Sequence, residues 1–386
     1  MTAAPRTPTR PVSTTTAPGL TPTLASSDYC SATVFELERE RIFHGGWMYV
    51  CHLDGIPAGA KRVFDIAGQS VVVTRDHDAA VHAFANVCRH RGSQLCDPAM
   101  TVAAPGSIRC PYHSWTYGLD GRLLATPRVD DQFDRGAMGL WAYHAEIWNG
   151  LVFVSLTPPA MDVGSWLAAT APTIDHFAHL PIAGYRIAAR TEATVRANWK
   201  ILFENYSECL HCAVVHPELT DLIPLYRTGD VVHPGDPSAP VGFAEGRTAF
   251  TRTGHTVQTT LPGVSERGEY DGVGIFPNLF FDLTPSVLSL TAMFPIAPDR
   301  TLVVGEYLFA ADNFDRTGFD PTPEVEFNEL VGSQDNTVCE MVQRGVASKA
   351  FTTGGLTRKD AYVADFVEGY RTCMAASSNN TQGGTR

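Results

Sequence analysis

Positive charge is scarce in this chain: 29 lysines and arginines stand against 41 aspartates and glutamates, a formal net charge of −12 over 386 residues. Nucleic acids attract basic surfaces, so this balance argues against nucleic acid as a partner. It mildly favours cationic ligands. Apolar runs are also short, and none could span a bilayer, so we expect no membrane partner. The Thr/Pro/Ala-rich N-terminus has no apolar segment typical of a secretory signal, which predicts a cytoplasmic location.

Two further absences narrow the chemistry. The nine cysteines are odd in number and widely scattered, which does not suggest a disulfide framework and favours a cytosolic protein with metal-binding thiolates. No glycine-rich dinucleotide fingerprint occurs at a strand–helix turn, so we expect that the chain does not bind nicotinamide itself.

A histidine- and carboxylate-rich stretch, residues 204–216, is the first candidate site. Two imidazoles and one carboxylate form the facial ligand set of a mononuclear non-haem Fe(II) centre, and His211 and His216 could be the imidazole pair. On a helix, Glu208 would share a face with His211, but His216 would point roughly 140° away from His211 about the helix axis. Both histidines reach one metal only if the helix distorts or ends between them, and Pro217 makes an ending plausible. The stretch alone leaves a solvated helix face equally open.

A second metal motif lies upstream, where two tight loops each offer one thiolate and one imidazole: Cys88 with His90, and Cys110 with His113. A Rieske [2Fe–2S] cluster needs two cysteines on one iron and two histidines on the other. The alternative is a structural Cys₂His₂ zinc site, but zinc fingers usually pair Cys with Cys and His with His. The alternating types favour the cluster. Trp115 and Tyr117 would either shield it or simply be core aromatics.

Hydrophobic patterning predicts the organisation around these motifs. Residues 1–24 should be disordered, and a short amphipathic helix should follow within residues 28–43. Short β-branched or aromatic runs at 47–51, 62–66, 70–74, 81–87 and 151–156 predict a small antiparallel β domain. Beyond Pro158 we predict a helix at 165–177, strands at 185–195, 274–281, 287–295 and 301–309, and helices at 323–346 and 359–374. Residues 218–270 are predicted to form a long loop over the site or a surface insertion.

The two metal-binding loops resemble a known family. Cys88-Arg-His-Arg-Gly and Cys110-Pro-Tyr-His-Ser-Trp-Thr-Tyr are similar to the Rieske motif of the oxygenase α subunits. Respiratory Rieske proteins carry an extra cysteine in each loop, where this chain has Ser93 and Tyr112, and this departure favours an oxygenase.

The resemblance implies an α+β fold, with an N-terminal all-β Rieske domain and a catalytic domain built of a curved antiparallel sheet and helices (helix-grip, START/Bet v1-like). The implied boundaries are a tail at 1–24, the Rieske domain with its leading helix at 25–157, the iron domain at 158–375 and a loose tail at 376–386.

The same resemblance implies the remaining site residues. In the family, Asn-Trp-Lys leads into the iron helix, as at Asn198 here, and the third ligand is an aspartate on a late helix, which assigns Asp335. Glu340 is the alternative, and the residues alone do not choose between them. Three positions before the first histidine the family generally has an aspartate that links the cluster of one subunit to the iron of its neighbour. Glu208 holds that position. Glu-Cys-x-His-Cys followed by His-Pro resembles the branch that acts on carnitine, choline and betaines.

The resemblance therefore implies the terminal oxygenase of a multicomponent monooxygenase. Its cofactors would be a [2Fe–2S] cluster and mononuclear Fe(II), and its partners O₂, a small quaternary ammonium substrate and a separate flavin/iron–sulfur reductase fed by NAD(P)H. A homotrimer is implied as well. Hydroxylation next to nitrogen would remove an N-methyl group or cleave another C–N bond. The alternatives are an oxygenase of aromatic substrates, a Rieske electron-transfer protein, and a zinc-stabilised binding module.

Two smaller expectations concern the pocket and the helix. Trimethylammonium groups bind to aromatic faces through cation–π contacts. Five aromatic residues lie on segments that could line such a pocket: Phe203, Tyr206, Phe276, Phe280 and Phe281. Cys209 and Cys212 form a C-x-x-C motif, and we expect both to pack in the core as small apolar thiols.

Overall fold

The N-terminal segment folds onto the C-terminal half of the chain. The computed structural model describes residues 19–97, 104–129, 132–234, 241–265 and 268–375. Strand β1 (Thr21–Pro22) pairs with β18 (Gly355–Leu356), so the prediction of disorder is wrong for residues 19–24; residues 1–18 lie outside the described part. The expected amphipathic helix appears as α1 (Ser26–Cys30), α2 (Ala32–Glu38) and a π-helical turn over Arg39–Phe43. Residues 21–43 therefore pack against elements of the C-terminal half of the chain.

The predicted β domain contains two antiparallel sheets. The larger has the strand order β2-β11-β10-β5-β4-β3-β6, and the smaller has the order β7-β8-β9. Their bounds are β2 Met48–His52, β3 Ala60–Ile66, β4 Gln69–Arg75, β5 Val81–Ala85, β6 Ala104–Pro105, β7 Ile108–Arg109, β8 Thr116–Tyr117, β9 Leu123–Ala125, β10 Ala142–Trp148 and β11 Leu151–Ser155. Sequence patterning missed β10, because its residues alternate between half-buried and exposed and include no buried apolar run.

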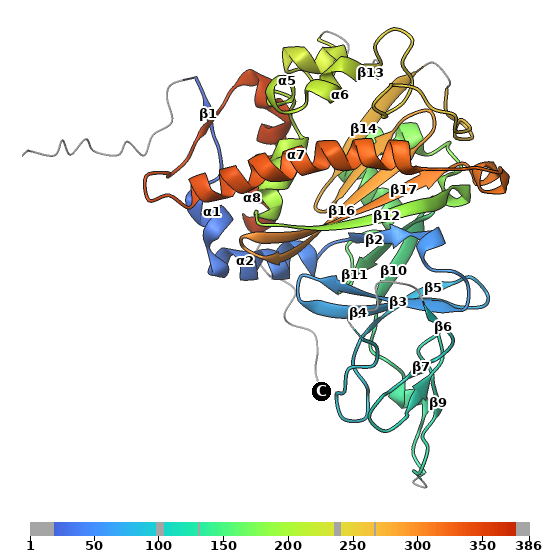
Figure 1. The fold of residues 1–386 in the computed structure, drawn as a ribbon. Helices are drawn as coiled ribbons and strands as arrows, with labels where there is room; N and C mark the ends of the chain where they lie inside the picture. Colours follow the sequence, from blue (N-terminus) through green and yellow to red (C-terminus); the bar gives the residue numbers. More distant parts are fainter. Residues whose placement is uncertain (1–18, 98–103, 130–131, 235–240, 266–267, 376–386) are drawn as a thin grey trace, which may run out of the picture.

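The second half of the chain is one antiparallel sheet covered by helices. Its strands follow the order β12-β17-β16-β15-β14-β13. The bounds are β12 Arg186–Val195, β13 Val241–Gly242, β14 Glu269–Ile275, β15 Leu279–Leu283, β16 Leu288–Ala297 and β17 Arg300–Phe309. The helices are α3 Val163–Thr170, α4 Trp199–Tyr206, α5 Cys212–Val215, α6 Pro217–Leu222, α7 Thr322–Val346 and α8 Ala361–Ala375. Figure 1 shows the long helix α7 running along β12 and β17.

One predicted strand, residues 274–281, is wrong. The structure splits it into the end of β14, a turn and the start of β15. Pro277 has no N–H to donate to a neighbouring strand, which explains why the strand is interrupted there. The predicted helix at 165–177 is also shorter, since α3 ends at Thr170 and a 3₁₀ turn follows.

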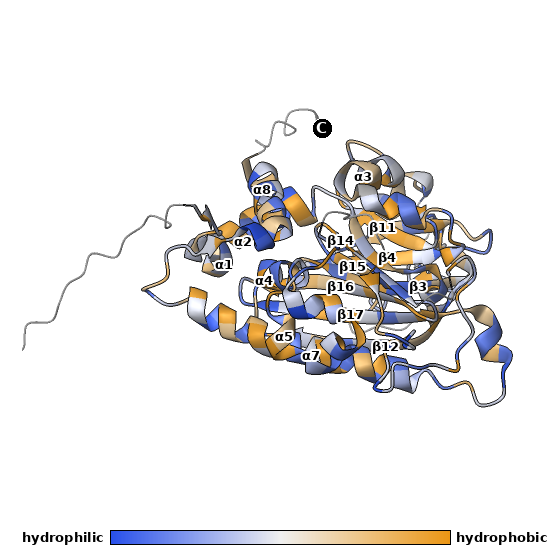
Figure 2. Cartoon of the chain, turned by 90° about the horizontal axis from the view of Figure 1, so that it is seen from above, coloured by the Kyte–Doolittle hydropathy of each residue, from blue (hydrophilic) through white to orange (hydrophobic). Residues whose placement is uncertain are grey.

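Buried aromatic side chains pack the helical segments against one another. Trp199 of α4 contacts Phe43 edge-on, with ring centroids 5.2 Å apart, and Phe203 stacks on Phe366 of α8 at 4.6 Å. The two halves are joined where Tyr49 of β2 donates its hydroxyl to Glu306 of β17 at 2.8 Å. Figure 2 shows apolar and polar residues interleaved along α7 and α8, as expected of helices with one face on a core. Among the described residues, the structure has no helix long and apolar enough to cross a bilayer.

Candidate metal centres and the adjoining cavity

Two breaks in helical structure position the histidine pair. Helix α4 ends at Tyr206, so the prediction of one helix carrying both Glu208 and His211 is wrong. His211 is instead the N-cap of the one-turn helix α5, and His216 terminates that helix with φ −122° and ψ 65°. The next helix, α6, begins at Pro217. The predicted helix end before this proline is confirmed, and it turns both imidazoles toward one point.

Helix α7 brings a carboxylate to the same point. Asp335 Oδ1 lies 2.9 Å from His216 Nε2 and 3.3 Å from His211 Nε2. One ligand atom from each of the three residues lies within 4.8 Å of the others, which meets the geometric condition for a single metal ion. Glu340, the alternative third ligand, instead pairs with Arg196 at 2.9 Å and does not join this group.

Each imidazole is oriented by a partner at its other nitrogen. Glu208 Oε1 lies 2.6 Å from His211 Nδ1, and Gln334 Oε1 lies 2.8 Å from His216 Nδ1. Acceptors at Nδ1 fix the tautomer that leaves Nε2 free for a metal. The contact between Glu208 and His211 predicted from their spacing is therefore present, although no helix carries it.

The ionisation of this group suits a divalent cation. Burial lowers the pKa of His211, but hydrogen bonds with Asp335 and Glu208 outweigh it and raise that pKa to about 9. Burial opposes ionisation of Asp335, yet its contacts with both histidines hold the pKa below the usual carboxyl range. Two imidazoles and one carboxylate with open positions are the ligand set of mononuclear Fe(II). The residues therefore fit the iron, which would replace the proton on His211.

The C-x-x-C motif differs from expectation. Cys209 and Cys212 form a disulfide across the turn that holds His211, with their Cα atoms 5.0 Å apart. Both residues are buried, as predicted, but they are not free thiols. Among the described residues, the remaining seven cysteines are free.

The upstream loops bring the second set of candidate ligands together. Cys88 and Cys110 are buried and close enough for their thiols to interact, and the rings of His90 and His113 lie with centroids 4.7 Å apart. Burial opposes ionisation of Cys110, but the backbone N–H groups of His113 and Tyr112 lower its pKa. Two adjacent thiols that form no disulfide, beside two imidazoles, fit a Rieske cluster.

Aromatic residues pack against this loop pair. Trp115 is buried and stacks on His90, with ring centroids 4.7 Å apart and nearly parallel planes. Tyr117 is fully buried, and its hydroxyl lies 3.4 Å from Cys88 Sγ. His90 and Tyr112 are exposed. The sulfur side is therefore sealed, and the imidazole side faces outward.

A large cavity adjoins the His211–His216–Asp335 group. Its volume is about 1110 Å³, and it extends between the sheet, α7 and α8. Four of the five aromatic residues predicted from sequence line it: Phe203, Tyr206, Phe276 and Phe280. The fifth prediction is wrong, because Phe281 points into the core on the other side of the sheet and contacts Phe177 at 4.5 Å.

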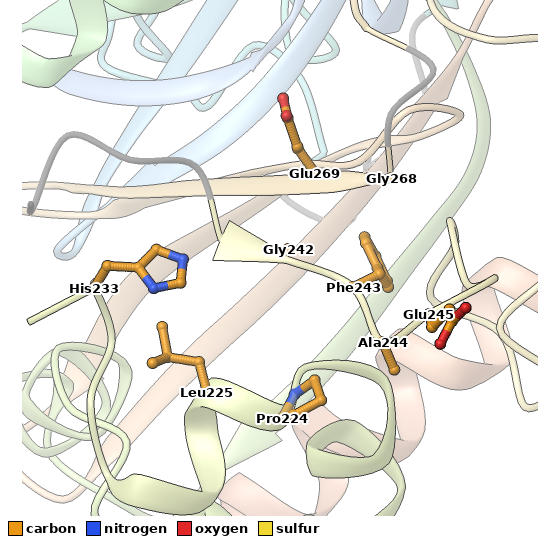
Figure 3. A pocket seen from close by; sticks show the side chains of 9 residues that line it. All are labelled: Pro224, Leu225, His233, Gly242, Phe243, Ala244, Glu245, Gly268 and Glu269. Atoms are coloured by element: carbon orange, nitrogen blue, oxygen red, sulfur yellow. The ribbon is translucent and has the colours of Figure 1, made fainter.

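The segment predicted as a loop over the site contains α6 and β13 in addition to loop structure. Its residues Tyr226, Val231 and Phe250 line the large cavity, so its described part covers the site. A smaller depression of about 700 Å³ lies between the 3₁₀ turn Pro224–Thr228 and strands β13 and β14 of the same segment. Figure 3 shows His233 beside Leu225 there, with Glu269 pointing elsewhere, and this depression contains none of the predicted metal ligands.

The two candidate centres lie at opposite ends of the molecule. In Figure 1, β7, which ends just before Cys110, and β9 of the same small sheet are at the bottom, whereas α5 and α6 are at the top. The large antiparallel sheets of both halves lie between them.

Comparison with known proteins gives a family for each half. A family model described as "Rieske [2Fe-2S] domain" matches residues 46–139, and one described as "Ring hydroxylating alpha subunit (catalytic domain)" matches residues 182–376. The first match rules out the zinc-site alternative for the cysteine–histidine loops. The second supports the mononuclear iron.

Relatives match nearly the whole chain. The glycine betaine monooxygenase oxygenase subunit of Chromohalobacter salexigens is 32% identical, over 90% of this chain and 84% of that protein. The carnitine monooxygenase oxygenase subunit of Acinetobacter baumannii is 28% identical, over 86% of this chain and 87% of that protein. A crystal structure of the quaternary ammonium Rieske monooxygenase CntA with L-carnitine has the same fold, with a TM-score of 0.72, 22% identity, and coverage of 93% of this chain and 97% of that one. The predicted α+β architecture is confirmed.

Proposed function

Since this chain belongs to the family of Rieske oxygenase α subunits, we propose that it is the terminal oxygenase of a multicomponent monooxygenase that acts on a quaternary ammonium compound. Hydroxylation of a C–H bond next to nitrogen would release an N-methyl group as formaldehyde or cleave another C–N bond. Glycine betaine, carnitine and choline, named in the relatives, define the substrate class. The observation that carries the proposal is the convergence of two imidazoles and a carboxylate beside an aromatic-lined cavity.

Separate groups of residues would hold the two cofactors and position the substrate. Cys88, His90, Cys110 and His113 would hold the cluster, and His211, His216 and Asp335 would hold the iron. When bound, the cluster supplies single electrons and the iron supplies the activation of O₂. Glu208 orients His211 through the 2.6 Å contact and would accept a second N–H from a cluster histidine of a neighbouring subunit. The aromatic walls exclude water and position the substrate.

Transfer between subunits is part of the proposal, with a homotrimer as the assembly. The exposed imidazole side of the cluster loops and the distance between the two ends in Figure 1 support it. Leu210 and Val214, which flank His211, are 42% and 85% exposed and would be covered by the neighbour. Co-expressing a Cys110→Ala chain with an Asp335→Asn chain tests this. Turnover in the mixed assembly, absent from either variant alone, is expected; inactivity of a properly loaded mixed trimer would contradict transfer between subunits.

The activity is tested with the purified oxygenase, a separate NAD(P)H-dependent reductase and O₂. We expect about three irons per chain and formaldehyde or another C–N cleavage product from a quaternary ammonium compound. Two irons per chain would indicate an electron-transfer protein. Cis-diols formed from arenes, with no quaternary ammonium compound consumed, would indicate an oxygenase of aromatic substrates. Such coupling to a reductase that uses cytosolic NAD(P)H would also agree with the predicted cytoplasmic location.

A further inference from the structure

The ionisable side chains that line the cavity are mostly acidic. Among the described residues, the lining contains no lysine and no arginine. Glu208 and Asp335, both at the metal centre, would together balance the charge of Fe(II). Five further carboxylates line the same cavity: Asp271, Asp282, Glu329, Asp365 and Glu368. Besides the two histidines at the metal centre, His176 is the one other histidine among the described lining residues, and it interacts electrostatically with Asp271.

Asp282 is the acid built most deeply into this wall. It stands in β15 between Phe281 and Leu283, both of which are buried. The hydroxyls of Tyr206 and Tyr270 both donate to its Oδ1, the first at 2.6 Å. Both side-chain hydrogen bonds that described residues donate to Asp282 end at Oδ1, none reaches Oδ2, and the side chain is partly exposed at the cavity wall. One carboxylate oxygen is therefore held by the protein and the other is left for a ligand.

Aromatic rings surround this carboxylate. Tyr206 stacks on Phe280 with ring centroids 3.9 Å apart, and Tyr270 meets Tyr226 edge-on at 6.3 Å. Tyr206, Tyr226, Tyr270 and Phe280 all line the cavity. Ring faces around a single anionic group form the environment that binds a quaternary ammonium ion, which cannot donate a hydrogen bond and is held by charge and cation–π contact.

We propose that Asp282, with Tyr206, Tyr226 and Tyr270, binds the ammonium head of the substrate, and that the substrate is a monocation without a carboxylate. This inference rests on the proposed function and narrows it: choline-like compounds are accepted, and zwitterions such as glycine betaine and carnitine are disfavoured. A zwitterion would bring its carboxylate into a cavity whose described walls offer no arginine or lysine to pair with it. An unpaired charge in such a site is costly, because protein walls screen it less than water does.

The sharpest test on the unaltered holoenzyme compares glycine betaine with its methyl ester. The ester keeps the trimethylammonium group and removes only the negative charge. We expect the dissociation constant, measured by calorimetry on the anaerobic holoenzyme, to be at least about tenfold lower for the ester and for choline than for glycine betaine. Turnover with the reductase should follow the same order. Equal or tighter binding of glycine betaine or carnitine would overturn the inference and leave the proposed function intact.

Replacing Asp282 tests whether this residue causes the preference for cations over zwitterions. Asp282→Asn keeps the shape and can still accept from the two tyrosine hydroxyls, so it should load three irons per chain. It should bind choline at least about tenfold more weakly than the wild-type protein does. The difference in dissociation constant between glycine betaine and its methyl ester should also become smaller. Glu245→Gln, an exposed acid in the smaller depression of Figure 3, is the matched control and should change neither. Unchanged choline affinity in a loaded Asp282→Asn protein would overturn the role of Asp282.

The two proposals fail separately. If no quaternary ammonium compound binds while arenes are oxidised, the proposed function fails and this inference with it. If quaternary ammonium compounds are oxidised but the zwitterions are preferred, only this inference fails. Should Asp282→Asn not fold, the comparison of betaine with its ester on the wild-type protein still decides the question.

Discussion

Replacing Asp335 by asparagine should empty the mononuclear site without disturbing the cluster. The side chain keeps its size, but the oxygen that lies 2.9 Å and 3.3 Å from the two imidazole nitrogens becomes a neutral amide oxygen. Residues that merely orient a metal ligand contribute about 10- to 100-fold to metal affinity. Loss of the one charged ligand should exceed that, which corresponds to at least about 2.7 kcal/mol of binding free energy. The iron content should fall from about three to about two per chain.

The structure also supplies a readout that needs no iron. In the metal-free protein, Asp335 is the leading favourable contribution to the raised pKa of His211, which is about 9. Asp335→Asn should therefore lower this pKa by about one unit or more, as measured by NMR titration. Glu340→Gln is the matched control, because Glu340 pairs with Arg196 away from the histidines. Retention of three irons by Asp335→Asn, with loss of one by Glu340→Gln, would refute the reasoning.

Three more predictions concern neighbouring residues. Gln334→Ala removes the acceptor 2.8 Å from His216 Nδ1, so iron affinity measured by chelator competition should fall about 10- to 100-fold; unchanged affinity would contradict the orienting role. Glu208→Gln should keep both metal centres loaded but nearly abolish coupled turnover, and wild-type turnover would show that this carboxylate is not needed. Burial raises the pKa of Glu204 to about 7 despite the hydroxyl of Tyr29 at 2.7 Å. The folded state thus holds this proton more tightly, so stability should decline by up to about 3 kcal/mol as pH rises from 4.5 to 7. Glu204→Gln should flatten that decline in chemical denaturation, and an unaltered slope would refute the assignment.

Sequence reasoning selected candidate ligands that the structure brings together, because the chemistry of each motif is local. Each cluster loop carries its own thiolate and imidazole, and His216 stands directly before a proline that ends its helix. The carboxylate on α7 could be chosen only through family resemblance, since Asp335 and Glu340 look alike until the structure shows which one faces the histidines.

What the sequence missed depends on tertiary placement. Asp282 comes from β15, whereas Tyr206 and Tyr270 come from α4 and β14. Only the folding of the sheet brings these three side chains together. A signal was nevertheless present: a single acid inside the apolar run of residues 279–283, where a charge is costly unless it has a partner or a purpose.

The pairing of β1 with β18 has a consequence for how the chain is made. Strand β1 and helices α1 and α2 precede the cluster-bearing domain in the sequence, yet they pack on helices and strands that emerge from the ribosome more than 150 residues later, such as α4 and α8. Strands β2 to β11, which include the cluster loops, therefore lie in the sequence between two segments that pack against each other. Because domains generally fold as units, we expect these strands to fold before the later segment has been synthesised. During synthesis, α1 and α2 can therefore complete their packing contacts only after α8 has been made.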